Sequence, residues 1–328
     1  MPLSTEKLKI AREASWQAFG RQVTFYVPGM FHCQSMRGKY QAISVTGNAC
    51  ELRCDHCKGR LLRSMIGATT AEALIEKAVR LAEHGNYGIL ISGGCDADGR
   101  LPWNRFIPAI QEIKRRTNLY ISIHSGIVDD ITARRLKKAG IDQALIDVIG
   151  DDKTMACSYR LPSGVSKIIA SLKALEQAGI ETVPHIVCGL NGGRIKGEKQ
   201  AVSIVSRFNI RQVVIVSLMS LGTEWRRRFG MPRADDIVEI LVEARLSMPQ
   251  VAISLGCARE RGNRCLETLS IDAGVNRMAL PSDEAIARAE SYGLAINYQP
   301  TCCSVGSHIG MPDRQPISSN YANSDETP

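Results

Sequence analysis

The stretch Thr46-Gly47-Asn48-Ala49-Cys50-Glu51-Leu52-Arg53-Cys54-Asp55-His56-Cys57 decides how this sequence of 328 residues is interpreted. Its three cysteines have the spacing CxxxCxxC and directly follow a short β-branched run at 42–46. Three thiolates on one short loop suit three irons of a cubane iron–sulfur cluster and leave the fourth iron without a protein ligand. Such an open iron can bind a small molecule, whereas an electron carrier of the ferredoxin type supplies a fourth cysteine.

A zinc site is the alternative interpretation of this loop. Structural zinc takes four ligands, usually from paired CxxC motifs, and His56 is the candidate for the fourth. His56 sits between two of the cysteines, a position from which we do not expect it to reach the same ion. The chain is long and has an odd cysteine count, and its first 22 residues lack the apolar core of a secretory signal, so we expect a reducing compartment and favour ligands and reactive thiols over disulfides. The 11 cysteines are Cys33, Cys50, Cys54, Cys57, Cys95, Cys157, Cys188, Cys257, Cys265, Cys302 and Cys303.

Outward from the loop, short apolar runs alternate with amphipathic stretches. The expected strands are 42–46, 88–92, 119–123, 143–149, 182–187, 212–218, 251–255 and 275–280. The expected helices between them are 70–83, 103–116, 129–139, 165–178, 197–207, 234–247 and 283–292, with a turn or two within 258–274. This alternation predicts an α/β fold, a parallel (β/α)8 barrel of the TIM type, with a doubly wound open sheet as the alternative.

We expect three regions along the chain. Residues 1–40 form an N-terminal extension, whose first 20 residues are a helix laid against the barrel. Residues 41–305 form the barrel with a C-terminal cysteine segment, and the polar tail 306–328 is expected to be disordered. The Gly-rich stretch 189–197 is interpreted as a flexible loop over the site, since it lacks the Gly-Lys-Ser/Thr of a phosphate-binding loop.

The composition is that of a globular protein with a basic surplus. Hydrophobic residues make up 44% and charged residues 23%, and 41 basic against 33 acidic residues give a net charge of +8. No apolar run approaches the roughly 18 residues of a membrane span, so we expect a cytoplasmic protein without a membrane partner. The surplus favours an acidic partner, either nucleic acid or protein.

The cysteine loop and a glycine motif after the second predicted strand resemble the radical S-adenosylmethionine (radical SAM) superfamily over about residues 40–300. The resemblance implies that the open iron of a 4Fe-4S cluster binds SAM, and that one electron cleaves it to methionine and a 5′-deoxyadenosyl radical. It also implies an electron donor such as ferredoxin or flavodoxin. The residue before the third cysteine is often a carbocyclic aromatic in this family, and here it is His56.

The resemblance also suggests which residues bind SAM. Ser92-Gly93-Gly94-Cys95 looks like the family's Gly-Gly-Glu motif for the SAM amino group, with Cys95 in place of the acid; a simple βα turn is the alternative. By the same analogy, polar groups at the ends of the later strands hold the ribose and carboxylate of SAM, and His124 and Asp147 are the candidates. A structural hydrogen-bonding role is the alternative for both. The sequence identifies no catalytic residue.

A second 4Fe-4S cluster is predicted from Cys257, Cys302 and Cys303. Cys257 follows the seventh predicted strand, and an extended run at 294–298 would return the chain to the mouth of the barrel, where Cys302 and Cys303 would lie near Cys257. Buried inert thiols are the alternative. The candidates for one further ligand are Cys33, Cys95, Cys188, Cys265, Ser304 and Arg259.

A closer resemblance is to the biotin-synthase-like family that contains the two-protein lipoyl synthase of archaea and some bacteria. It rests on five stretches of sequence, which are 25–30 (FYVPGM), 50–59 (CELRCDHCKG), 144–151 (ALIDVIGD), 256–259 (GCAR) and 301–304 (TCCS). It implies that one component of a pair adds sulfur to C6 or C8 of an octanoyl group on a lipoyl-domain lysine, with the auxiliary cluster as sulfur donor. The implied partners are the paralogous component and the octanoylated lipoyl-domain protein.

Two further kinds of function are left open by the sequence. One is another radical SAM sulfurtransferase, either biotin-synthase-like or a tRNA methylthiolating enzyme. The chain shows no appended RNA-binding module, so nucleic acid is not expected as a partner. The other is a non-catalytic iron–sulfur carrier.

Overall fold

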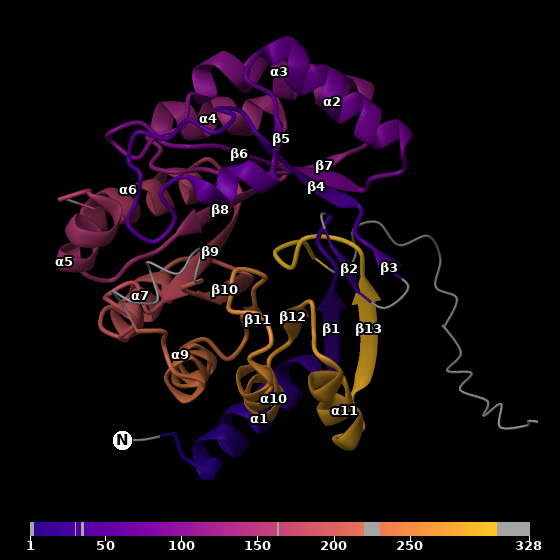
Figure 1. Ribbon diagram of the computed structural model, residues 1–328, viewed down its shortest axis with the longest axis vertical. Coiled ribbons are helices and arrows are strands. Elements are labelled where there is room, and N and C mark those ends of the chain that lie inside the picture. The colour runs from indigo at the N-terminus through magenta and orange to yellow at the C-terminus, as the bar shows by residue number, and fades with distance from the viewer. Residues whose placement is uncertain (1–2, 30, 34–35, 163, 220–229, 307–328) are drawn as a thin grey trace, which may run out of the picture.

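The computed structural model describes residues 3–29, 31–33, 36–162, 164–219 and 230–306. A curled sheet of eleven strands forms its centre, and every strand pair within this sheet is parallel. Helices cover the outer face of the sheet, as Figure 1 shows. The predicted α/β fold class, a parallel TIM-type sheet, is therefore confirmed.

The strand order gives the topology of the sheet. From one edge to the other the strands are β13 (Ala295–Gln299), β1 (Gln22–Tyr26), β12 (Arg277–Ala279), β11 (Ala252–Leu255), β10 (Gln212–Ser217), β9 (Glu181–Cys188), β8 (Gln143–Asp147), β7 (Tyr120–His124), β6 (Gly88–Ser92), β4 (Tyr40–Ser44) and β5 (Ile66–Gly67). A separate antiparallel pair consists of β2 (His32–Cys33) and β3 (Met36–Arg37). All eight expected strands are present as β4 and β6–β12, and β1, β5 and β13 extend the sheet beyond them.

The helices follow the strands in the expected rhythm. They are α1 (Thr5–Phe19), α2 (Ala71–Glu83), α3 (Trp103–Arg116), α4 (Asp130–Ala139), α5 (Asp152–Thr154), α6 (Gly164–Gln177), α7 (Glu198–Val205), α9 (Ala234–Ser247), α10 (Arg264–Asp272) and α11 (Asp283–Ser291). Capping residues fix several of their ends: the Thr70 hydroxyl accepts from the amide of Ala73 at the start of α2, and Gly140 ends α4 with a φ of 93°. Two short helical turns, η1 (Arg60–Ser64) and the π-helical η2 (Met155–Tyr159), complete the set.

The N-terminal extension contributes to the sheet as well as covering it. Strand β1 pairs with β12 and with β13, and its residues Val23, Phe25 and Tyr26 are fully buried. Helix α1 lies against α10, where Arg12 donates to the carbonyl of Asp272. Residues 22–26 are therefore a strand of the barrel, which the sequence did not suggest. Of the predicted disordered tail, residues 307–328 lie outside the described residues.

The end of the described chain fills the inside of the curled sheet. In Figure 1 the yellow segment beyond β13 curves into the middle of the ring of strands. Thr301, Ser304 and Val305 are fully buried there. Among the described helices we find none with the length and hydrophobicity that a bilayer-spanning helix needs.

Candidate functional site

The cysteine loop leaves β4 in a series of tight turns. The hydroxyl of Thr46 donates to the carbonyl of Ala49 at 2.9 Å and accepts the amide of Gly94 at 2.6 Å. The carbonyl of Cys54 accepts the amides of Cys57 and Lys58 at 3.1 and 2.8 Å. Lys58 adopts a φ of 48°, in the left-handed region that few non-glycine residues occupy. The backbone of the loop is therefore fixed by its own hydrogen bonds and by contact with β6.

These turns bring the three thiols of the loop close together. Burial raises the pKa of the Cys54 thiol well above its usual range, and the charges of Cys57 and Cys50 raise it further. Within the described residues no three His, Cys, Asp or Glu side chains converge on a single metal ion. A cubane cluster makes a different demand, because each of its irons takes one thiolate, and three soft thiol donors on one loop fit that demand.

The glycine motif after β6 lies directly against the cysteine loop. A Cβ atom on Gly94 would stand 2.0 Å from the carbonyl oxygen of Ala49 and 2.5 Å from the Cβ of Cys50. The carbonyl of Ser92 accepts the Val45 amide at 2.8 Å, so one of its lone pairs serves the sheet. Glycine is therefore needed at position 94 for the close approach of the loop, in addition to any contact with a ligand.

The predicted residues His124 and Asp147 lie in one polar cluster with Tyr159 and His185. The Tyr159 hydroxyl donates to Oδ2 of Asp147 at 3.1 Å, and the rings of His124 and His185 are 5.5 Å apart. Burial lowers the pKa of both histidines, that of His185 to about 4, while the charge of Asp147 opposes the shift. Neutral imidazoles beside one carboxylate provide donors and acceptors for a polar ligand.

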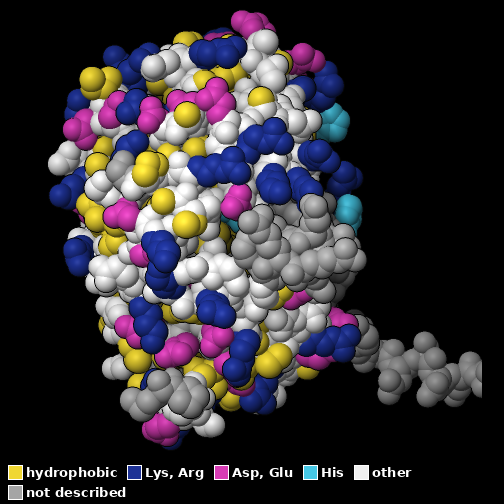
Figure 2. All heavy atoms as spheres, turned by 60° about the vertical axis from the view of Figure 1, so that its left-hand side comes forward, with side chains coloured by type: hydrophobic (Ala, Val, Ile, Leu, Met, Phe, Trp, Pro, Cys, Tyr) yellow, Lys and Arg dark blue, Asp and Glu magenta, His cyan; other side chains and the backbone are white. Residues whose placement is uncertain are grey.

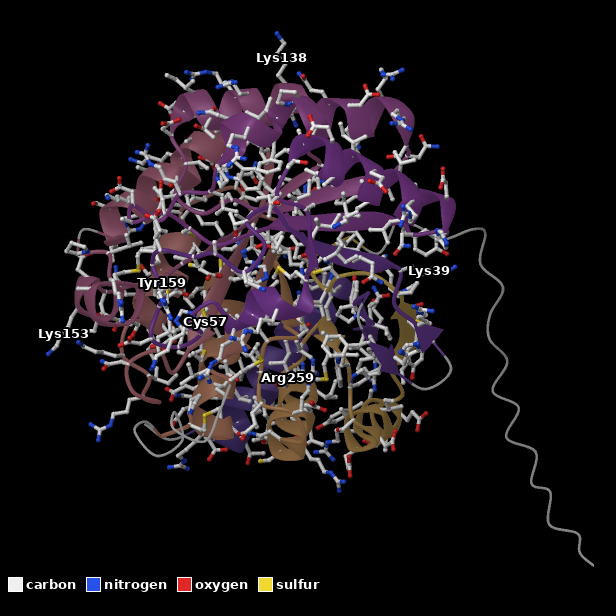
Figure 3. The ribbon with its side chains drawn as sticks, turned by 45° about the horizontal axis from the view of Figure 1, so that its top comes forward. Lys39, Cys57, Lys138, Lys153, Tyr159 and Arg259 are labelled. Carbon is white, nitrogen blue, oxygen red and sulfur yellow. The ribbon has the colours of Figure 1, made fainter. Side chains whose placement is uncertain are left out.

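Cys95 lies close to both the cysteine loop and this polar cluster. Burial raises the pKa of its thiol to about 12, and the nearby charges of Cys50 and Asp147 raise it further. Tyr159 lies on a π-turn that the sequence did not predict. Burial raises the pKa of its hydroxyl, and the charge of the nearby Cys57 contributes to this rise; Figure 3 labels both residues. Sequence reasoning missed Tyr159, because nothing in the stretch Met155–Tyr159 signals a π-turn.

The structure also brings Cys257, Cys302 and Cys303 together. Hydrogen bonding from the Cys303 thiol lowers the pKa of both Cys257 and Cys302, while the same interactions raise that of Cys303. Cys303 is 2% exposed and packs among strand residues such as Leu145 and Val214 inside the sheet. The expectation that this segment returns to the mouth is wrong in one respect: Gln143 and Gln212, the first residues of β8 and β10, bind its carbonyls within the barrel.

The candidates for a further ligand to this thiol group differ in position. The guanidinium of Arg259 is occupied by other contacts, since it donates to Glu267 and to the carbonyls of Gly256 and Leu280.

The cysteine candidates also differ from one another in position. Cys265 is exposed on α10, and Cys188 is buried beside Glu198. Cys95 lies with the cysteine loop, and the side chain of Cys33 is outside the described residues.

Ser304 is the candidate that stands beside the thiols. Its hydroxyl lies 3.1 Å from the sulfur of Cys302, and its side chain is fully buried. Of the named candidates with described side chains, Ser304 is thus the one whose contact with the group is a direct hydrogen bond.

Hydrogen bonds to one carboxylate fix both ends of the Gly-rich stretch 189–197. The buried carboxylate of Glu198 accepts the amide of Gly189 at 2.8 Å and that of Lys196 at 2.6 Å. Gly193 has a φ of 83°, and a Cβ there would stand 1.9 Å from the carbonyl oxygen of Gly230. The expectation of a flexible loop overlooked this carboxylate, which closes the turn.

Comparison with known proteins agrees with this geometry. The profile of the radical SAM superfamily matches residues 44–196, which include the cysteine loop, the glycine motif, His124 and Asp147. No curated protein matches the chain at a significant level.

Several solved structures share the fold at low sequence identity. Methylornithine synthase (PylB) superposes with a TM-score of 0.62 at 18% identity, over 89% of this chain and 88% of that one. HydG, a maturase of the [FeFe]-hydrogenase, gives a TM-score of 0.63 at 15% identity, over 84% of this chain and 60% of HydG. HydG from Carboxydothermus hydrogenoformans gives 0.59 at 13% identity, over 88% and 71%. The match to the radical SAM superfamily covers residues 44–196, and the likeness to these structures, all below 25% identity, shows a shared fold.

Proposed function

We propose that this chain is a radical SAM sulfurtransferase, one component of a two-protein lipoyl synthase. It would add sulfur to C6 or C8 of an octanoyl group carried on a lysine of a lipoyl domain. The observation that carries the proposal is the meeting of Cys257, Cys302 and Cys303 inside the sheet. A sulfur-inserting enzyme needs a second group of soft ligands beside its radical site, and in this proposal these thiols are that group.

In this proposal Cys50, Cys54 and Cys57 hold the first 4Fe-4S cluster. When bound, this cluster and SAM supply a 5′-deoxyadenosyl radical, and the second cluster supplies the sulfur. Ser92, Gly93 and Gly94 lie against the cysteine loop, where backbone carbonyls can accept from the SAM ammonium group. His124 and Asp147 stand on neighbouring strands and offer hydrogen bonds to the ribose and carboxylate of SAM.

The environment of the second thiol group suits an anionic cluster. The hydrogen bond with Cys303 is the largest cause that lowers the pKa of Cys257, and the charges of Arg261 and Arg259 lower it further; both effects favour the thiolate that would bind iron. The side chain of Arg259, labelled in Figure 3, is fully buried. Burial of Cys303 inside the sheet keeps water from this region, which protects a reactive carbon radical.

The surface charge supports an acidic protein partner. Figure 2 shows a group of Lys and Arg side chains on one face of the molecule. On the segments that follow β4, β6, β8 and β9, the exposed cations are Arg53, Lys58, Arg60, Arg63, Arg100, Lys153, Arg160, Arg194 and Lys196. Within the described parts of these segments no Phe, Tyr or Trp is exposed for stacking on bases, which favours an acidic protein over RNA.

This charge distribution fits an acidic lipoyl domain that presents its acylated lysine to the mouth of the barrel. The other proposed partners are the paralogous radical SAM component and an electron donor such as ferredoxin or flavodoxin. A single component that makes one insertion needs the paralogue for the second sulfur.

An anaerobic assay with an octanoyl-lysyl peptide of lipoyl-domain sequence tests the proposal. The reconstituted chain, SAM and a reductant are combined with the peptide, with and without the paralogue, and the products are analysed by mass spectrometry. We expect this chain to add a mass equal to one sulfur, either to the octanoyl peptide itself or to the peptide that the paralogue has already thiolated, so that the two proteins together add two sulfurs. The variant C302S should abolish the increase, while C157S, which alters an exposed cysteine on η2, should not.

Two outcomes contradict the proposal in different ways. An unchanged peptide mass in the full mixture, together with formation of 5′-deoxyadenosine, would show a radical SAM enzyme with another substrate. An intact cluster that yields no 5′-deoxyadenosine under reducing conditions would instead leave a non-catalytic carrier.

A further inference from the structure

The turn that follows β8 contacts the cysteine loop through three successive residues. The carbonyl of Ser158 accepts the amide of Asp55 at 2.9 Å, and the carbonyl of Tyr159 lies 4.0 Å from the sulfur of Cys54. Arg160 then forms an ion pair with Asp55 at 3.2 Å. Three consecutive residues, 158–160, therefore contact two consecutive residues of the loop that carries the thiols, Cys54 and Asp55.

Tyr159 makes two further contacts with its side chain. Its ring lies 4.8 Å from the ring of His56, with the two planes at 46°, and its hydroxyl donates to Oδ2 of Asp147 at 3.1 Å. The side chain is buried, with 9% of its surface exposed. One residue thus sets the position of an imidazole from the cysteine loop and of a carboxylate at the end of β8.

The turn itself is held in an uncommon conformation by its surroundings. Residues Met155–Tyr159 form a π-helical turn, which ends at Arg160 with a φ of 59°. The hydroxyl of Ser158 donates to the carbonyl of Leu190 at 2.8 Å, and a Cβ on Gly164 would stand 2.2 Å from the end of the Met155 side chain. Single π-turns of this kind concentrate at functional sites.

His56 shows that this arrangement is incomplete without a ligand. Its Nδ1 atom is buried and has no hydrogen-bond partner among the described residues. A buried ring nitrogen without a partner is unfavourable, so a molecule bound beside the cysteine loop would be expected to supply one. Asp147 faces the same region and accepts hydrogen bonds from hydroxyl groups.

We propose that Tyr159 is a positioning residue that holds His56 and Asp147 as two contacts for the nucleoside part of SAM. The His56 imidazole would hydrogen-bond the edge of the adenine ring, and the Asp147 carboxylate would accept from the ribose hydroxyls. The contact of Tyr159 with both residues sets the spacing between these two points. The inference rests on the radical SAM domain and the proposed SAM site, and is independent of sulfur insertion.

The experiment measures SAM binding separately from any reaction of an acyl substrate. The variants Y159F and H56F are prepared anaerobically beside the control Y292F, which removes a tyrosine hydroxyl that donates to a carboxylate, Asp272, at 2.8 Å on the outer side of the barrel. Iron content and thermal melting are recorded first. The dissociation constant for SAM is then measured with the oxidised proteins, and the electron paramagnetic resonance spectrum of the reduced cluster is compared with and without SAM.

We expect Y159F to keep its iron and to weaken SAM binding roughly tenfold, the scale of one lost hydrogen bond to a charged group. H56F should weaken it similarly, and Y292F should bind SAM like the wild type. Wild-type SAM affinity in both Y159F and H56F would overturn the proposal. So would equal weakening in Y292F, because the effect would then be a general loss of stability. If Y159F weakens SAM binding as expected but the wild-type chain inserts no sulfur into the acyl peptide, the proposed function is refuted and the role of Tyr159 stands.

Discussion

The side-chain amide of Gln212 donates to the carbonyl of Cys303 across 2.6 Å, at the first residue of β10. Gln143, the first residue of β8, binds the carbonyl of Ser304 at 3.0 Å, and the Tyr26 hydroxyl binds that of Val305 at 3.0 Å. Side chains from three strands thus fix the carbonyls of a segment that has no secondary structure of its own. The position of the thiols of Cys302 and Cys303 depends on these contacts.

The variant Q212L should therefore loosen the C-terminal segment. Leucine keeps the volume but leaves the buried Cys303 carbonyl without its donor, which we expect to cost about 1–3 kcal/mol of stability. On the proposed function, iron in the reconstituted protein should fall by about half, because only the second 4Fe-4S cluster is lost. Iron and sulfide analysis with the visible spectrum checks this. The control Q41L removes a similar amide contact, to the carbonyl of Gly29, and should keep its iron.

The variant G94A should affect the first cluster, in contrast to Q212L, which should affect the second. An alanine Cβ would stand 2.0 Å from the carbonyl oxygen of Ala49, so the cysteine loop must move away from β6. On the proposed function, we expect loss of the first cluster and of SAM cleavage, measured as 5′-deoxyadenosine. The matched control is G67A, whose Cβ would meet only the Cα of Gly47 at 4.0 Å. Full SAM cleavage by G94A would show that the loop tolerates displacement.

The sequence predicted the strands well because most of them are continuous apolar runs between helices. It did not predict β1, where the stretch Gln22–Tyr26 pairs with β12 and β13, two strands more than 250 residues away in sequence. Long-range pairing of this kind leaves no local pattern. The π-turn Met155–Tyr159 is similar, because its conformation depends on contacts with the cysteine loop and Leu190.

The proximity of the three thiols of the cysteine loop could be predicted, because it follows from the CxxxCxxC spacing itself. The meeting of Cys302 and Cys303 with Cys257 followed from the direction of an extended run, now seen as β13. Their depth inside the sheet did not follow, because it is set by Gln143 and Gln212, glutamines whose partners are backbone carbonyls.

Acidification should destabilise the chain through His185. Burial, followed by the charge of His124, lowers the pKa of His185 from its ordinary value of 6.5 to about 4, while Asp147 and a contact with the Val183 carbonyl oppose the shift. A lowered pKa in the folded state means that stability is fully present above 6.5 and is lost as the pH falls toward 4. The loss is up to about 1.4 kcal/mol per pH unit for this group.

Urea unfolding of the apo-protein at several pH values in that range measures the effect. The variant H185N should show a shallower fall in the free energy of unfolding, whereas H84N, at an exposed histidine on the outer surface, should keep the wild-type slope. A wild-type slope in H185N would mean that other groups control the acid response.

Removing one partner of the buried pair Arg259–Glu267 should cost far more stability than removing one partner of an exposed pair. Nη2 of Arg259 lies 2.6 Å from Oε1 of Glu267, with the side chains 0% and 3% exposed. The variant R259M leaves the Glu267 carboxylate buried and unpaired, and should cost about 3–5 kcal/mol. The control R264M breaks a pair of similar length, 2.7 Å to Glu284, with side chains 70% and 41% exposed, and should cost less than about 1 kcal/mol. The double variant R259M/E267M removes both charges and should recover part of the loss in urea unfolding; equal costs for R259M and R264M would show that the buried pair adds nothing.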